Sequence, residues 1–185
     1  MTKNLRYALI LLLICAVSAF LLAVINAITA PVIEEQNIQA RLRALTAVSG
    51  GMEIGEEVAV TDNKMISYYI DLSENGNLLG YIVGLVGAGY GGEMTIVASY
   101  SLDGAVQYAQ LLAHTETPGL GSKAEESGYM EKFKDTGAAK PVPTTKAMLA
   151  DSDAQAVSGS SVTFTAIAKA LEAGSGFVKQ LGGVE

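Results

Sequence analysis

One uncharged stretch constrains this chain more than any other feature. No charged residue occurs from Tyr7 to Ile33, and most of the side chains there are apolar. A helix that crosses a bilayer needs about 20 such residues. The apolar region of a cleaved signal peptide is shorter, about 7–15 residues, and residues 27–30 offer only a weak cleavage site. We therefore expect an anchor within residues 1–33, which contacts the membrane through residues 7–33 and is closed by Pro31.

The charged residues on either side of this stretch predict its orientation. Lys3 and Arg6 precede it, whereas Glu34 and Glu35 follow it at once. Basic residues next to a span tend to stay in the cytoplasm. The sequence thus predicts a single-pass protein of the cell membrane whose C-terminal part is extracytoplasmic.

The composition beyond the anchor excludes several kinds of site. All but two of the 12 basic residues lie there, together with all 19 acidic ones. Such a surface repels phosphate backbones, so we expect no nucleic-acid partner. Cys15 lies within the span and His114 is the single histidine. Neither a disulfide nor a metal site built on Cys or His ligands is therefore expected outside the membrane.

The rest of the chain divides into a stalk and one domain. In residues 34–50, Ile38, Leu42 and Leu45 recur at helical spacing, and glycines then break the pattern. This favours a helical stalk over residues 34–50 and an outer domain over residues 51–185.

The middle of the outer domain predicts an antiparallel sheet of about four strands or more. Residues 65–72 and 78–92 are rich in β-branched and aromatic side chains, and Asn75-Gly76 between them is a strong hairpin signal. Two further β-like runs flank Asp103-Gly104.

The C-terminal third predicts helices and loops. Residues 128–135 favour a short helix, and residues 136–155 a loop, a short strand and a further loop. A helix is expected from residue 162, ended by Gly174. Its apolar face is formed by Phe164, Ile167, Ala168 and Leu171. The fold class is thus α+β: one transmembrane helix, then a domain with an antiparallel sheet and flanking helices.

Hydroxyl groups crowd the start of that last helix, in the sequence "AVSGSSVTFTAIAKAL". The residues are Ser158, Gly159, Ser160, Ser161 and Thr163. One interpretation is capping, in which a serine accepts hydrogen bonds from the first-turn N–H groups. The other is an anion site, because the same N–H groups and the helix dipole favour negative charge.

Two glycine-rich stretches are further candidates. Residues 114–123, "HTETPGLGSK", and residues 87–93, "GAGYGGE", each fit an ordinary turn or a loop that approaches a ligand closely. The second matches neither a P-loop nor a dinucleotide fingerprint. We expect His114 to be structural rather than a catalytic base.

Four blocks in a fixed order carry a resemblance to a known family. They are "ITAPVIEEQ", "GYGGEMTIVASYSLDG", "HTETPGLG" and "SGSSVT". In this order they resemble the G subunit of the Rnf electron-transport complex. The related C subunit of the sodium-pumping NADH:quinone reductase shares the FMN-binding domain but is less similar, since its anchor-proximal region is usually larger.

The resemblance implies FMN bound covalently through a phosphoester. The family attachment motif is Asp, two variable residues, Ser or Thr, Gly, Ala, then Thr or Ser. Ser158 and Gly159 match it, and Ser160 replaces the usual Ala. Ser161 occupies the acceptor position, with Thr163 as the alternative. Gln155 stands in place of the Asp, which puts flavin attachment in question, although Asp153 lies two residues earlier.

The same resemblance implies the surroundings and the partners. The flavin would be bounded by Glu116, Thr117, Gly119, Leu120 and Gly121. The expected partners are the other membrane subunits of the Rnf complex and a flavin transferase during maturation. The protein would relay electrons through its FMN, with no catalytic residue or metal of its own, within a complex that moves electrons between ferredoxin and NAD and couples this to Na⁺ or H⁺ transport. A stand-alone tethered flavoprotein and a non-redox anchored module are the alternatives.

Overall fold

The computed structural model describes residues 3–119, 121–126 and 128–182. The chain forms two compact units, Met1–Arg41 and Leu42–Glu185.

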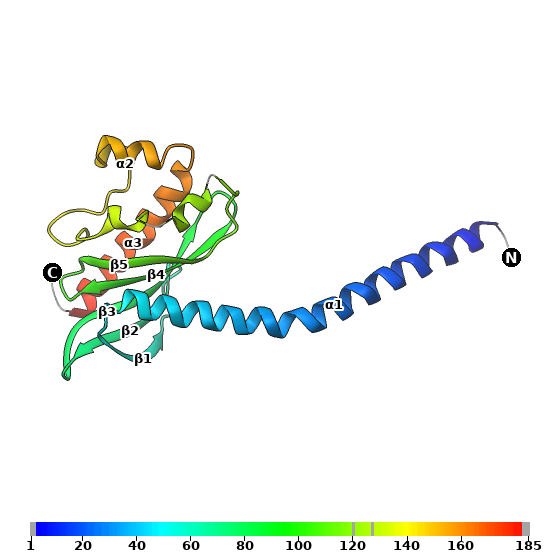
Figure 1. The fold of residues 1–185 in the computed structure, drawn as a ribbon, viewed down its shortest axis with the longest axis horizontal. Helices are drawn as coiled ribbons and strands as arrows, with labels where there is room; N and C mark the ends of the chain where they lie inside the picture. The colour runs from blue at the N-terminus through cyan, green and yellow to red at the C-terminus, as the bar shows by residue number, and fades with distance from the viewer. Residues whose placement is uncertain (1–2, 120, 127, 183–185) are drawn as a thin grey trace. The chain divides into compact units, whose positions relative to one another are not determined.

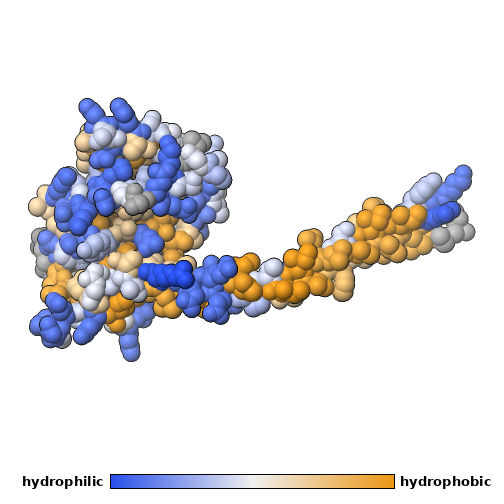
Figure 2. Space-filling view, viewed as in Figure 1, coloured by the Kyte–Doolittle hydropathy of each residue, from blue (hydrophilic) through white to orange (hydrophobic). Residues whose placement is uncertain are grey.

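The first unit is almost entirely one apolar helix. Helix α1 (Lys3–Val48) passes through Pro31, so the proline does not end it. Its apolar side chains are exposed along nearly the whole first unit (Figure 2). In the described part of the chain it is the one helix long and apolar enough to cross a membrane. The limits of the anchor and the stalk remain predictions.

The second unit is built on a five-stranded antiparallel sheet (Figure 1). Its strands follow one another in chain order: β1 (Glu53–Ala59), β2 (Ile66–Glu74), β3 (Asn77–Ala88), β4 (Glu93–Ser101) and β5 (Val106–Ala113). Short 3₁₀ helices follow at Gly121–Glu125, Met130–Phe133 and Lys146–Met148, then helices α2 (Asp151–Ala156) and α3 (Ser161–Gly182). The predicted α+β class is confirmed. The two predicted tight turns join β2 to β3 and β4 to β5.

Helix α3 covers one face of the sheet and supplies the main core (Figure 1). Its predicted apolar face is correct: Phe164, Ile167 and Leu171 are fully buried against the inward side chains of β3 and β4. Burial of each such side chain stabilises the fold by about 1.5–3 kcal/mol. The hydroxyl of Tyr100 on β4 donates a hydrogen bond to the Leu171 carbonyl (3.1 Å). The middle of α3 is therefore fixed relative to the end of β4.

The opposite face of the sheet packs against the last turns of α1. Val48 is buried there with Leu72 and Ile82, and Leu45 packs against them. These residues belong to the second unit, which thus includes the end of α1 within its own core.

Two predictions about the C-terminal third are wrong. Helix α3 does not stop at Gly174 but continues to Gly182. Gly174 is buried where an added Cβ would overlap the Tyr100 hydroxyl, so this glycine permits close packing rather than ending the helix. Within residues 136–155, all of them described, there is a 3₁₀ turn and helix α2 but no strand.

Candidate functional site

The turn between β3 and β4 is tied to a segment far along the chain. The Gly91 N–H donates to Glu116 Oε1 (2.9 Å), and the Thr115 hydroxyl donates to the Gly91 carbonyl (2.9 Å). Within the turn, the Gly89 N–H donates to the Gly92 carbonyl (2.8 Å). The glycine-rich stretch "GAGYGGE" is therefore a turn clamped to the loop that follows β5.

Glu116 joins this turn to helix α3. The Thr163 hydroxyl donates to Glu116 Oε2 (2.6 Å), and both residues are buried. Burial alone would raise the pKa of Glu116. The hydrogen bonds from Thr163 and from the backbone N–H groups of Gly91 and Tyr90 outweigh it and hold the pKa below its ordinary value. Both oxygens of the carboxylate thus accept hydrogen bonds, and Glu116 connects the β3–β4 turn, the loop after β5 and α3.

Two glycines make room for this carboxylate. A Cβ added at Gly89 would overlap Glu116 Oε1, and one added at Gly121 would overlap Glu116 Oε2. Glu116 thereby explains why glycine occurs at two positions that are distant in sequence.

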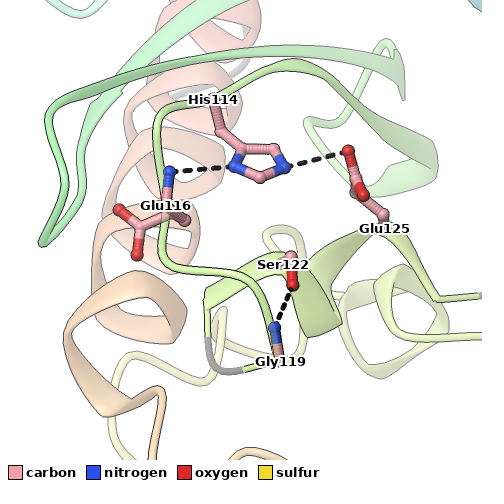
Figure 3. A network of polar contacts seen from close by, with 5 residues as sticks. All are labelled: His114, Glu116, Gly119, Ser122 and Glu125. Atoms are coloured by element: carbon pink, nitrogen blue, oxygen red, sulfur yellow. Dashed lines mark hydrogen bonds and ion pairs between the residues drawn. The ribbon is translucent and has the colours of Figure 1, made fainter.

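His114 lies next to Glu116 and makes polar contacts through both ring nitrogens (Figure 3). Its Nδ1 accepts the Glu116 N–H (3.0 Å), and its Nε2 lies 2.9 Å from Glu125 Oε1. With Nδ1 as the acceptor, Nε2 is the ring nitrogen that donates to Glu125. Both ring nitrogens of His114 are therefore occupied by these two contacts.

The loop after Glu116 is closed locally. The Gly119 N–H donates to the Ser122 hydroxyl (2.8 Å), as Figure 3 shows, and the Ser122 N–H is 3.5 Å from the Thr117 carbonyl. Gly119 has φ +79°, a left-handed conformation that favours glycine.

The hydroxyl-rich segment places its groups in different environments. Ser161 begins α3 and is exposed, whereas Ser160 and Thr163 are buried. The Ser160 hydroxyl donates to the Val157 carbonyl (3.3 Å). In the described part of the chain, no side chain accepts from the N–H groups of Ser161, Val162 or Thr163. The capping interpretation is therefore not supported, and the first turn of α3 keeps free donors.

A cavity of about 380 Å³ lies between these segments. It is lined by Tyr90, Glu116, Thr117, Gly121, Gly159, Ser160, Ser161, Val162 and Thr163. Its volume is within the range of small-molecule sites, about 300–1,000 Å³. A second hollow of about 470 Å³ also borders on Ser161 and Val162 and is lined further by Met65, Ala88, Thr165, Ala166 and Lys169.

Most residues predicted for the site thus line one cavity. Ser158 is exposed outside its lining, Gly119 supports the loop without lining the cavity, and Leu120 lies outside the described residues. Sequence reasoning missed Tyr90 and Val162 as lining residues. The glycines around Tyr90 marked the stretch, but its proximity to the start of α3 depends on long-range packing.

Comparison with known proteins places the chain in a family. The FMN-binding domain family matches residues 89–175, and the RnfG N-terminal region matches residues 1–48. The G subunit of the Na⁺-translocating ferredoxin:NAD⁺ oxidoreductase complex of Acetobacterium woodii is 31% identical over 178 residues, covering 88% of this chain and 85% of that protein. The chain belongs to the Rnf G-subunit family.

Other relatives extend this similarity. The G subunit of the proton-translocating ferredoxin:NAD⁺ oxidoreductase complex of Clostridium ljungdahlii is 26% identical over 172 residues, covering 92% of this chain and 86% of that protein. The G subunit of the ion-translocating oxidoreductase complex of Methanosarcina acetivorans is 29% identical over 125 residues, covering 67% of this chain and 64% of that protein.

The site of this Rnf G-subunit family member fits the FMN that its domain class binds. The matched FMN-binding domain begins at Gly89 and includes the whole cavity lining. The free N–H groups at the start of α3 suit a phosphate. The cavity also presents apolar surface from Tyr90 and Val162, which suits a flat ring system.

Proposed function

We propose that this chain is the flavoprotein subunit of an Rnf-type ferredoxin:NAD⁺ oxidoreductase and relays electrons through FMN esterified to Ser161. The observation that carries the proposal is the position of Ser161. It is the exposed first residue of α3, on the wall of the cavity, beside N–H groups that no side chain of the described residues caps. When bound, FMN supplies the redox chemistry, and the protein positions it.

The start of α3 suits the phosphate end of the cofactor. The free N–H groups of the first helical turn point out of the helix end, where the helix dipole favours an anion. A phosphoester on the Ser161 oxygen places its remaining charge next to these donors. Covalent attachment also removes the need for an affinity high enough to retain free FMN.

Thr163 is the weaker acceptor candidate. Its hydroxyl is buried and already donates to Glu116. Esterification there would break this hydrogen bond and place a phosphate beside an ionised carboxylate, where like charges repel. Ser161 is exposed and has neither obstacle.

The family and the apolar helix support a proposal for the membrane arrangement and the partners. We propose that α1 spans the membrane once, that the second unit is extracytoplasmic, and that other membrane subunits of the complex exchange electrons with it. The names of the two relatives given above specify Na⁺ translocation in one case and proton translocation in the other. We therefore propose that the complex transports an ion, without specifying which.

Flavin attachment further requires a transferase that acts on the segment before α3. Gln155 is exposed on α2 where the family motif has Asp. We propose that the transferase accepts this segment, and that Gln155→Asp raises the flavin-to-protein ratio. Equal ratios in the two proteins would show that the carboxylate at this position is not limiting.

The decisive experiment compares substitutions at Ser161. The full chain is produced together with a flavin transferase, denatured, and examined for flavin fluorescence in the gel. Ser161→Ala removes the fluorescent band, whereas Ser161→Thr retains it because the hydroxyl is kept. An undiminished band in Ser161→Ala would contradict the proposed acceptor, and a colourless wild-type protein would contradict the proposed cofactor link.

A further inference from the structure

The side chain of Tyr90 is unusually exposed to solvent. Its side chain is 79% exposed, more than any other large apolar side chain in the described residues, including those of α1. Soluble surfaces tolerate scattered apolar residues, but this one lines the cavity that also contains Ser161. The position therefore calls for a specific explanation.

The backbone that carries Tyr90 is held firmly on both sides. The preceding Gly89 closes the turn through Gly92, and the following Gly91 is fixed by Glu116 and by the Thr115 hydroxyl. An added Cβ at Gly91 would overlap the Thr115 carbonyl, so turn and loop are in close contact. The ring of Tyr90 is thus presented by a well-anchored turn rather than by a loose loop.

A second exposed apolar side chain lines the same cavity from another element. Val162, in the first turn of α3, is 52% exposed and directly follows Ser161. Much of the remaining lining is polar or glycine. Two apolar side chains from segments far apart in sequence therefore meet at the cavity that adjoins the acceptor hydroxyl.

We propose that Tyr90 stacks on the isoalloxazine ring of the attached FMN and holds it in the cavity, with Val162 contacting the same ring system. This rests on the proposed function. Aromatic rings prefer offset or edge-to-face contacts with other π systems, and a flavin tethered at Ser161 needs such a contact to hold its ring in one orientation. Tyr90 is thus a positioning residue for the cofactor.

The second hollow beside Ser161 is the competing location for the ring. Its lining by Met65, Ala166 and Lys169 does not include Tyr90. If the isoalloxazine ring lay in that hollow, Tyr90 would not contact the flavin, and its substitution would not change the flavin signals.

The test uses the full chain in detergent, flavinylated by a co-produced transferase, with Tyr90→Ala, Tyr90→Phe and the control Tyr108→Ala. Tyr108 is also exposed but lines neither cavity beside Ser161. Flavin content is first measured on denatured protein. Native flavin fluorescence and visible circular dichroism then report whether the ring contacts a fixed aromatic partner.

Stacking predicts that Tyr90→Ala loses most of the visible circular dichroism and brightens several-fold in the native state. Tyr90→Phe retains the dichroism because a ring remains, and Tyr108→Ala matches wild type in both signals. If Tyr90→Ala has wild-type flavin content and unchanged signals, the inference is overturned while the proposed function stands. If the wild-type protein carries no flavin, the proposed function fails instead.

Discussion

Two hairpin turns of the same sheet are stabilised in different ways. The β4–β5 turn is closed by its own residues: the Ser101 hydroxyl donates to Asp103 Oδ1 (2.5 Å), and the Ala105 N–H donates to the same oxygen (3.3 Å). The β3–β4 turn is held by Thr115 and Glu116, about 25 residues away. The hydrogen bonds that close the first turn come from its own residues, whereas those that hold the second come from a distant segment.

This difference indicates which turn belongs to the functional site. The hydrogen bonds of Ser101 and Ala105 to Asp103 stay within the β4–β5 turn, and its Gly104 packs against Ser175 and Lys179 of α3 rather than against the cavity. The β3–β4 turn, Glu116 and Thr163 on α3 form one connected set, and the cavity lies among them. The following changes test whether the two turns differ as described.

The largest effect is expected from Gly91→Ala in the clamped turn. The new Cβ would meet the backbone of Thr115 and Glu116, which cannot move cheaply. We expect a loss of about 3 kcal/mol in the free energy of unfolding, the upper end of ordinary overpacking. Denaturant unfolding of the full chain measures it.

Gly176→Ala is the matched control for this change. Gly176 lies inside α3 with no atom within 4 Å of an added Cβ. The same substitution there is expected to stabilise the protein by about 0.5–1 kcal/mol, since alanine favours a helix. Equal stability of Gly91→Ala and wild type would show that the turn is not clamped.

A smaller effect is expected from Glu116→Gln, and it depends on pH. The amide loses charge-assisted hydrogen bonds to Thr163 and Gly91, which costs about 1–2 kcal/mol near neutral pH. The pKa of Glu116 is lower in the folded protein than in the unfolded chain. Its stabilising effect is therefore present above its ordinary pKa and is lost as the pH falls through the folded value.

Unfolding measured from neutral to acid pH checks this expectation. The difference between Glu116→Gln and wild type shrinks as the pH falls. A difference that stays constant over this range would mean that the charge of Glu116 does not hold the segments together.

The smallest effect is expected from Asp103→Asn, the same carboxylate-to-amide change made within the β4–β5 turn. Hydrogen bonding from the Ser101 hydroxyl lowers the pKa of Asp103, but the side chain is exposed and asparagine can accept the same bonds. We expect a change within about 0.5 kcal/mol and unaltered flavin content. A loss of flavin in Asp103→Asn alone would contradict the separation between the two turns.

The contrast between the two turns also explains which features of the fold could be predicted from the sequence. Asn75-Gly76 and Asp103-Gly104 specify their turns by local chemistry, and the apolar period of α3 identified its buried face. The prediction that Gly174 ends α3 was wrong because the sequence alone does not distinguish a glycine that makes room for Tyr100 from a glycine that ends a helix.

Within the candidate site, the glycines and hydroxyls were visible as patterns. The sequence did not show that these residues lie together. The order of the strands and the packing of α3 bring together Glu116, Gly91 and Thr163. The role of Tyr90 likewise depends on its exposure, which no spacing rule supplies.

The most direct test of the account is the site of flavin attachment. The full chain, produced with a flavin transferase, is digested, and the peptide that contains residues 158–163 is fragmented in a mass spectrometer. The account predicts one FMN phosphoester on the Ser161 oxygen. FMN on Thr163, FMN on a residue outside this segment, or an unmodified peptide would contradict it.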